Sequence, residues 1–126
     1  MLPTTQEWVA KAEADYDVVC LLLKSRKRSR YDPICFHAQQ CVEKYLKARL
    51  NESGVPFTKT HDLVLLLHST VTIEPAWISY LNPMKALTIS AVAPRYPGMN
   101  ATVVHARSAA KLCRQFREEA RRSLGV

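Results

Sequence analysis

The chain has 126 residues, 48% of them hydrophobic, which is enough for one domain with a buried core and excludes a chain that needs a disulfide scaffold to fold. The 18 Lys and Arg outnumber the 11 Asp and Glu, giving a formal charge of +7, so the surface is expected to attract phosphate, RNA or an acidic partner. The longest apolar run, residues 18–23, is far too short to span a membrane, and the first residues lack the basic and apolar regions of a secretory leader, which predicts a soluble, cytoplasmic protein.

Apolar residues at three- and four-residue spacing predict two long amphipathic helices in the first half of the chain. Thr4 and Glu7 form the pattern of a capping box at the start of the first helix. Asp32 and Pro33 are typical of the N-cap and first turn of the second helix, and Gly54 ends it. The predicted apolar faces are Trp8, Val9, Ala12, Tyr16, Val19, Cys20 and Leu23 in the first helix, and Ile34, Ala38, Cys41, Val42, Tyr45, Leu46 and Leu50 in the second.

Shorter elements follow. Thr60 is the expected N-cap of a third helix, which carries a leucine stripe on its inner face. Pro75 can open a fourth segment, and Pro83 should kink or divide it because an interior proline removes a backbone hydrogen bond. Only residues 71–73 resemble a strand, and three residues cannot form a sheet.

A last amphipathic helix is predicted after a break at residues 94–98, with Asn100 as its cap. Its expected inward face is Ala106, Ala109, Ala110, Cys113, Phe116 and Ala120. The sequence therefore predicts an all-α fold, an up-and-down bundle of four to five helices, with residues 1–126 in a single domain.

No pattern typical of a metal site, a cofactor site or a known catalytic mechanism occurs in the chain. His61 and His68 share a predicted helix face, but no third ligand has the spacing of a zinc site. The chain also lacks a Gly-rich phosphate loop, a G-x-S-x-G elbow and an H-E-x-x-H helix. We therefore expect no metal and no cofactor, and we assign no catalytic residue. The cysteines have no C-x-x-C spacing and are expected to be reduced and buried: Cys20, Cys35, Cys41 and Cys113.

The most specific pattern is FHAQQCVEKYLKA at residues 36–48, followed by KTHDL at 59–63 and by RYPG at 95–98 before the last helix. The first helix adds Trp8, Ala12, Asp15, Leu22 and Leu23. In these motifs and in their order, the chain resembles the higher eukaryotes and prokaryotes nucleotide-binding (HEPN) family over nearly its whole length. The resemblance implies a helical bundle that is usually dimeric and is often encoded beside a minimal nucleotidyltransferase, its partner.

The resemblance also implies a ligand: a nucleotide or RNA, bound in a module of the toxin–antitoxin type. The residues expected to bind it are His37, Gln40, Lys44, Lys47, Arg95 and Tyr96. Gln39 would join Gln40 and Lys44 in a polar rim along an inter-helix groove. Two structural interpretations remain open, because His37 could be a packed, hydrogen-bonded residue, and Lys47 could form a modest surface ion pair with Glu43.

Some members of the family are toxins that cut RNA without a metal, using an Arg followed after four to six residues by a His at the start of a late helix. Here nine residues separate Arg95 from His105, with a proline and a glycine between them. Arg30 and His37 have six residues between them, but they lie at the start of the second helix. A metal-independent ribonuclease toxin is therefore an alternative function, and a purely structural dimerisation module is a second.

Basic residues concentrate in the run 24–30 and on the predicted outer face of the last helix. The helix residues concerned are Arg107, Lys111, Arg114, Arg117, Arg121 and Arg122. A solvated face explains them, and so does contact with phosphate. Because no platform of interleaved basic and aromatic residues occurs in the sequence, recognition of bases is not predicted.

Overall fold

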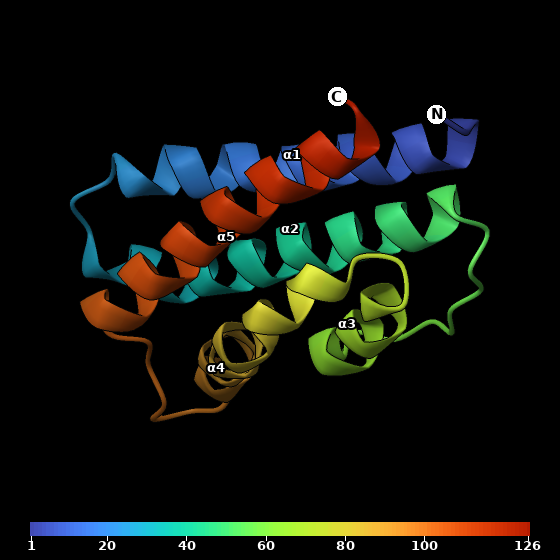
Figure 1. The fold of residues 1–126 in the computed structure, drawn as a ribbon. Helices are drawn as coiled ribbons and strands as arrows, with labels where there is room; N and C mark the ends of the chain where they lie inside the picture. The colour runs from blue at the N-terminus through green and yellow to red at the C-terminus, as the bar shows by residue number, and fades with distance from the viewer.

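A computed structural model describes all residues, 1–126, and contains five α-helices and no strand. The helices are α1 (Pro3–Leu23), α2 (Tyr31–Glu52), α3 (Leu63–Val71), α4 (Leu81–Val92) and α5 (Val103–Leu124) (Figure 1). There are also three short 3₁₀ turns. The turn η1 (Arg28–Arg30) precedes α2, η2 (Pro75–Tyr80) precedes α4, and η3 (Ala93–Arg95) follows α4. The predicted all-α bundle is confirmed.

Helix α2 lies at the centre of the bundle and contacts each of the other four α-helices. Helix α1 runs back along it, α5 crosses it at an angle, and α3 and α4 pack on its remaining side (Figure 1). The turn between α1 and α2 and the first turns of α5 consequently lie at the same end of the bundle (Figure 1). None of the five helices combines the length and the hydropathy that crossing a bilayer would require.

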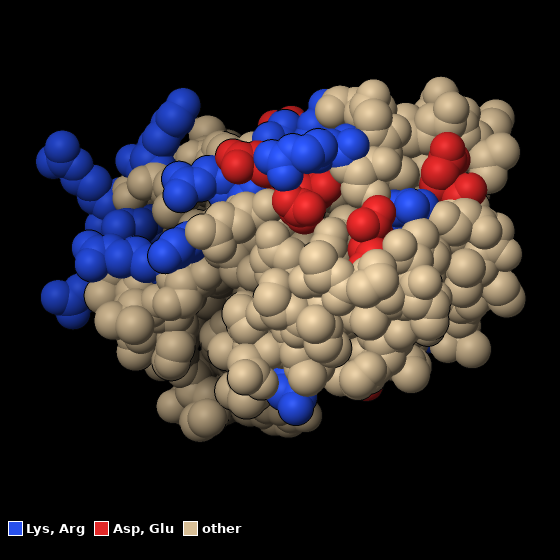
Figure 2. Space-filling model, in the orientation of Figure 1, with Lys and Arg blue, Asp and Glu red and all other residues tan.

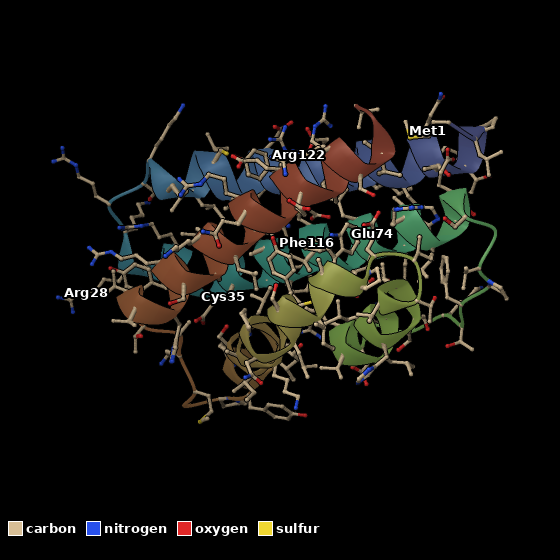
Figure 3. All side chains as sticks on the ribbon, in the orientation of Figure 1. Met1, Arg28, Cys35, Glu74, Phe116 and Arg122 are labelled. Atoms are coloured by element: carbon tan, nitrogen blue, oxygen red, sulfur yellow. The ribbon has the colours of Figure 1, made fainter.

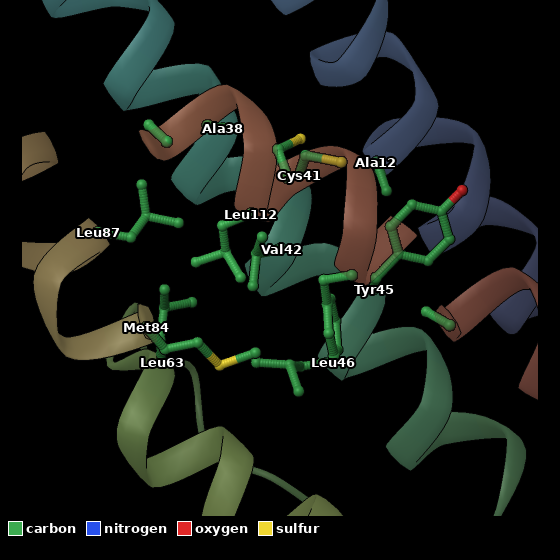
Figure 4. Packing of buried hydrophobic residues seen from close by; sticks show 14 of the residues in the cluster. Ala12, Ala38, Cys41, Val42, Tyr45, Leu46, Leu63, Met84, Leu87 and Leu112 are labelled. Carbon is green, nitrogen blue, oxygen red and sulfur yellow. The ribbon is translucent and has the colours of Figure 1, made fainter. Parts of the chain in front are cut away.

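The core is one cluster of 25 buried residues built around α2. Tyr45 and Leu46 of α2 are fully buried, next to α4 and α5 (Figure 4). The Phe116 ring of α5 meets the Trp77 ring edge to face at 5.0 Å and the Tyr80 ring at 5.1 Å, a geometry that adds to the gain from burying the rings. Because α5 turns small side chains toward the core, among them Ala106, Ala109 and Ala120, it can approach α2 closely.

The starts of α1 and α2 differ from the prediction. Helix α1 begins at Pro3, whose fixed φ suits the first helical position, so Thr4 and Glu7 lie inside the helix and form no capping box. Asp32 also lies inside its helix and does not cap it. Its Oδ1 instead accepts a hydrogen bond from the backbone N–H of Ala101 at 2.7 Å, which fastens the segment before α5 to α2.

The caps of α3 and α5 are likewise shifted by two residues. Asp62, not Thr60, caps α3, since its carboxylate accepts from the N–H groups of Val64 at 3.0 Å and Leu65 at 3.2 Å. Thr102, not Asn100, caps α5 in a reciprocal capping box with His105, both hydrogen bonds being 3.2 Å long. In both helices the cap is the residue whose side chain reaches a free N–H of the first turn.

Pro83 divides the fourth segment, as predicted, without kinking a helix. The chain forms η2 up to Tyr80, and Pro83 then lies in the first turn of α4, where its missing N–H leaves no helical hydrogen bond unmade. Residues 71–73 are the end of α3 and a turn, with no strand. Of the four free cysteines, Cys35, Cys41 and Cys113 are buried as predicted, whereas Cys20 is partly exposed.

Candidate functional site

Three side chains at the interface of α1 and α2 form the first polar cluster, the Asp15 cluster: Asp15, His37 and Lys44. Asp15 is 8% exposed, and its two oxygens lie 2.8 Å from His37 Nδ1 and 2.5 Å from Lys44 Nζ. Because an ionised carboxylate can only accept hydrogen bonds, the Nδ1–H of His37 donates to Asp15, and this bond leaves Nε2 free. His37 is thus hydrogen-bonded, and its partner, Asp15, was not identified from the sequence.

Phe36 connects His37 to a residue from a distant part of the chain. The guanidinium carbon of Arg95 lies 5.0 Å from the centroid of the Phe36 ring, and the His37 ring meets Phe36 edge to face at 5.1 Å. The turn η3 places Arg95 there at the end of α4. Tyr96, which follows η3, is 66% exposed. Two of the predicted binding residues, His37 and Arg95, are therefore neighbours of one ring.

A second polar cluster, the Glu43 cluster, consists of Gln39, Glu43, Lys47 and His61. Glu43 and Lys47 are joined at 3.1 Å, and their side chains are only 3% and 7% exposed. Glu43 Oε1 also accepts from Gln39 Nε2 at 3.3 Å and lies 3.0 Å from His61 Nδ1. The ion pair between Glu43 and Lys47 is present as predicted, but it is buried and not on the surface, and the Trp8 ring, 5.3 Å from Lys47 Nζ, helps to cover it.

The four predicted binding residues of α2 run along the helix from His37 in its second turn to Lys47 in its fifth, and three of them, His37, Lys44 and Lys47, contact residues of α1. Gln40 Nε2 donates to Gln39 Oε1 at 2.7 Å, which connects the two clusters. The structure brings His37 and Lys44 together on Asp15, whereas Lys47 belongs to the Glu43 cluster. No group of three or more His, Cys, Asp or Glu side chains is arranged to hold a metal ion.

Neither Arg–His pair of the ribonuclease alternative is in contact. Arg30 Nη1 donates to the Lys27 carbonyl at 3.1 Å, and its guanidinium lies over the Tyr31 ring. His105 Nδ1 accepts the N–H of Thr102 in the capping box of α5.

The outer face of α5 is less basic than predicted along its second half. Arg117 forms two hydrogen bonds of 2.7 Å to the carboxylate of Glu13 on α1, and Arg121 lies 3.3 Å from the same carboxylate. The Arg117 guanidinium lowers the pKa of Glu13 below its usual value, and the Tyr45 hydroxyl, 2.6 Å away, contributes to the same shift. These arginines therefore join α5 to α1, whereas Arg107, Lys111 and Arg114 have no acidic partner.

The unpaired cations gather at one end of the bundle, which we call the basic end. Only six of the 18 Lys and Arg form ion pairs: Lys44, Lys47, Arg49, Arg117, Arg121 and Arg122. Of the others, eight lie on the turn before α2 and on the first half of α5, where Figure 2 shows a dense group of basic side chains. They are Lys24, Arg26, Lys27, Arg28, Arg30, Arg107, Lys111 and Arg114. Arg28 projects outward from this end (Figure 3).

Comparison with known proteins agrees with this architecture. The HEPN domain family matches residues 5–123. A protein of Methanocaldococcus jannaschii that bears the name "Putative toxin MJ1304" is 31% identical over 97 residues, a match that covers 71% of the chain and 61% of that protein. The chain thus spans less than two thirds of the length of this relative. No solved structure matches the chain. Since the family match covers all five helices, the chain belongs to the HEPN domain family.

Proposed function

We propose that this chain is the HEPN component of a cytoplasmic module of the toxin–antitoxin type, and that it binds a nucleotide or RNA at its basic end. The observation that carries the proposal is the gathering of eight unpaired cations where α2 and α5 begin. Each cation that meets a phosphate releases condensed counterions, so binding at this surface weakens steeply as salt rises. His37 in α2 and Arg95 in η3 both lie against Phe36, next to this end, and the Arg95 guanidinium supplies further donors for the same ligand.

The module is proposed to work as a homodimer that acts with a minimal nucleotidyltransferase. A face of low charge supports association with another chain: α4 has one charged residue in twelve, Lys85, and Figure 2 shows few charged side chains over α3 and α4. Ile89 and Val92 of α4 and Met99 beyond it are exposed, and Ile89 and Met99 line a common cavity of about 330 Å³. Apolar surface with few charges is typical of the centre of a protein interface.

Metal-independent cleavage of RNA is a second candidate function, and the Asp15 cluster favours it. The carboxylate of Asp15 orients the His37 ring, whose side chain is 28% exposed, and leaves Nε2 free to take a proton. Arg95, which also packs against Phe36, has a planar fork of donors that suits a phosphate. On this hypothesis His37 acts as general base and Arg95 stabilises charge on the phosphate.

One experiment tests both functions. End-labelled total RNA is incubated with the purified chain and excess chelator, and both filter retention and cleavage are measured between 50 and roughly 300 mM salt. Retention that falls steeply with salt, without cleavage, supports the binding module. Cleavage that is lost in His37→Ala but kept in His105→Ala supports the ribonuclease.

Failure to retain RNA or mononucleotide at the lowest salt would overturn the binding proposal. The partner is tested separately by co-expression with a minimal nucleotidyltransferase. Co-purification of the two subunits is the expected result, and their separation at the first column would refute the partnership.

A further inference from the structure

Two hollows meet at the start of α2, and arginines and aromatic rings line both of them. The first, of about 520 Å³, is lined by Arg28, Tyr31, Asp32 and residues 100–103. The second, of about 240 Å³, is lined by Asp32, Pro33, Phe36, Ala91, Pro94 and Arg95. Asp32 belongs to both, so the hollows are adjacent.

Each hollow is lined by one arginine and one aromatic ring, and each ring has a guanidinium stacked on it. The Arg95 guanidinium lies 5.0 Å from the centroid of Phe36 in the second hollow. Tyr31 and Arg28 line the first hollow, and the guanidinium of Arg30, which does not line it, lies 4.9 Å from the centroid of the Tyr31 ring. A flat ring and a flat guanidinium both offer surfaces on which an unpaired nucleobase can stack.

The charge distribution orients a ligand in these hollows. The Asp32 carboxylate lies between them and repels phosphate, whereas the guanidinium groups of Arg28 and Arg95 attract it. A nucleotide therefore places its phosphate against the arginines and its base toward the rings. This arrangement requires bases that are free of a duplex, because in a double helix the base faces are stacked on one another and are not accessible.

We propose that the paired hollows at the start of α2 are a base-stacking subsite for single-stranded RNA, with Tyr31 and Phe36 as its platforms and Arg28, Arg30 and Arg95 as its phosphate and stacking partners. The proposal rests on the RNA binding proposed above and makes it more specific. The sequence showed no such platform, because Arg95 lies far along the chain from Phe36 and meets it only in the fold.

The test compares a 12-nucleotide single-stranded RNA with a duplex that carries the same number of phosphates. Phe36→Leu and Tyr31→Leu are expected to weaken binding of the single strand about 10-fold each and to leave duplex binding unchanged. The slope of affinity against salt should stay the same in both variants, because no phosphate contact is lost, and should fall by about one in Arg28→Ala. Phe57→Leu, in the connection between α2 and α3, is the matched aromatic control.

A 2-aminopurine in the single strand reports stacking directly, since its emission changes when the base lies against a ring. Far-UV circular dichroism shows that each variant is folded before it is assayed. Equal affinity for single strand and duplex, together with unaltered binding by Phe36→Leu and Tyr31→Leu, would refute the stacking subsite while leaving salt-dependent RNA binding intact. Absence of RNA binding by the unmodified chain would instead refute the proposed function, and this inference with it.

Discussion

Removing the buried charge of Lys47 should destabilise the fold far more than an exposed ion pair would. In Lys47→Met the aliphatic stem is retained, but the Glu43 carboxylate is left 3% exposed without its cation. Breaking a buried pair in this way costs about 3–5 kcal/mol, and the lower end applies here because Gln39 and His61 still donate to Glu43. For a chain of 126 residues, about 3 kcal/mol corresponds to a fall in Tm of about 10 °C.

Urea unfolding followed by circular dichroism would measure this loss in Lys47→Met, in Glu43→Gln and in the double variant. The double variant contains no uncompensated charge. The loss of unfolding free energy summed over the two single variants should therefore exceed the loss in the double variant by about 2 kcal/mol. Arg122→Met is a control, because that residue forms an exposed pair with Glu119 and should lose less than about 1 kcal/mol. Single losses below about 1 kcal/mol that add in the double variant would refute the assignment of a buried pair.

Three further results are expected. Arg117 lowers the pKa of Glu13 in the folded protein, so this carboxylate stabilises the fold at pH values above the pKa that Glu13 has in the unfolded chain. The stabilisation is lost as the pH falls through the lower pKa of the folded state. The urea midpoint of the wild type should therefore fall between about pH 5 and pH 3, and Glu13→Gln should flatten that dependence. The Cys41 thiol, whose pKa is raised by its contact with Cys113 and by burial, should resist alkylation in the folded protein, whereas the partly exposed Cys20 should react first, as mass spectrometry of tryptic peptides would show. Ile89→Lys should shift the mass measured by light scattering from dimer to monomer, and an unchanged mass would exclude the α4 face from the interface.

Helices could be predicted from the sequence, because a helix buries a stripe whose spacing depends only on its own geometry. The faces of α2 and α5 contain the predicted residues, among them Tyr45 and Phe116. Caps were less predictable because several residues compete for the same N–H groups. Asp32 is the plainest case, because it accepts from the N–H of Ala101, which is 69 residues away. The sequence around Asp32 cannot predict that contact.

The candidate site could be predicted only in part, because its contacts also join residues that are far apart in the chain. His37 and Arg95 were identified by their place in motifs, but their common contact with Phe36 depends on how the end of α4 packs against α2. The Glu43–Lys47 pair has the spacing of a surface pair within one helix, but the Trp8 ring from α1 covers Lys47, and His61 from the segment before α3 contacts Glu43. Charge pairing was also non-local, since Glu13 neutralises arginines that lie more than a hundred residues later.

The central position of α2 has a consequence for how the protein opens. A helix that contacts every other helix stays covered while any of them remains in place. Its amides are therefore exposed only when the whole bundle unfolds. In native-state hydrogen exchange, the middle of α2 should therefore exchange last and report the global free energy, while α3 can open by itself. The proposed stacking platforms, Tyr31 and Phe36, belong to this helix, whereas the arginines proposed beside them, Arg28, Arg30 and Arg95, lie in segments outside it that can open separately.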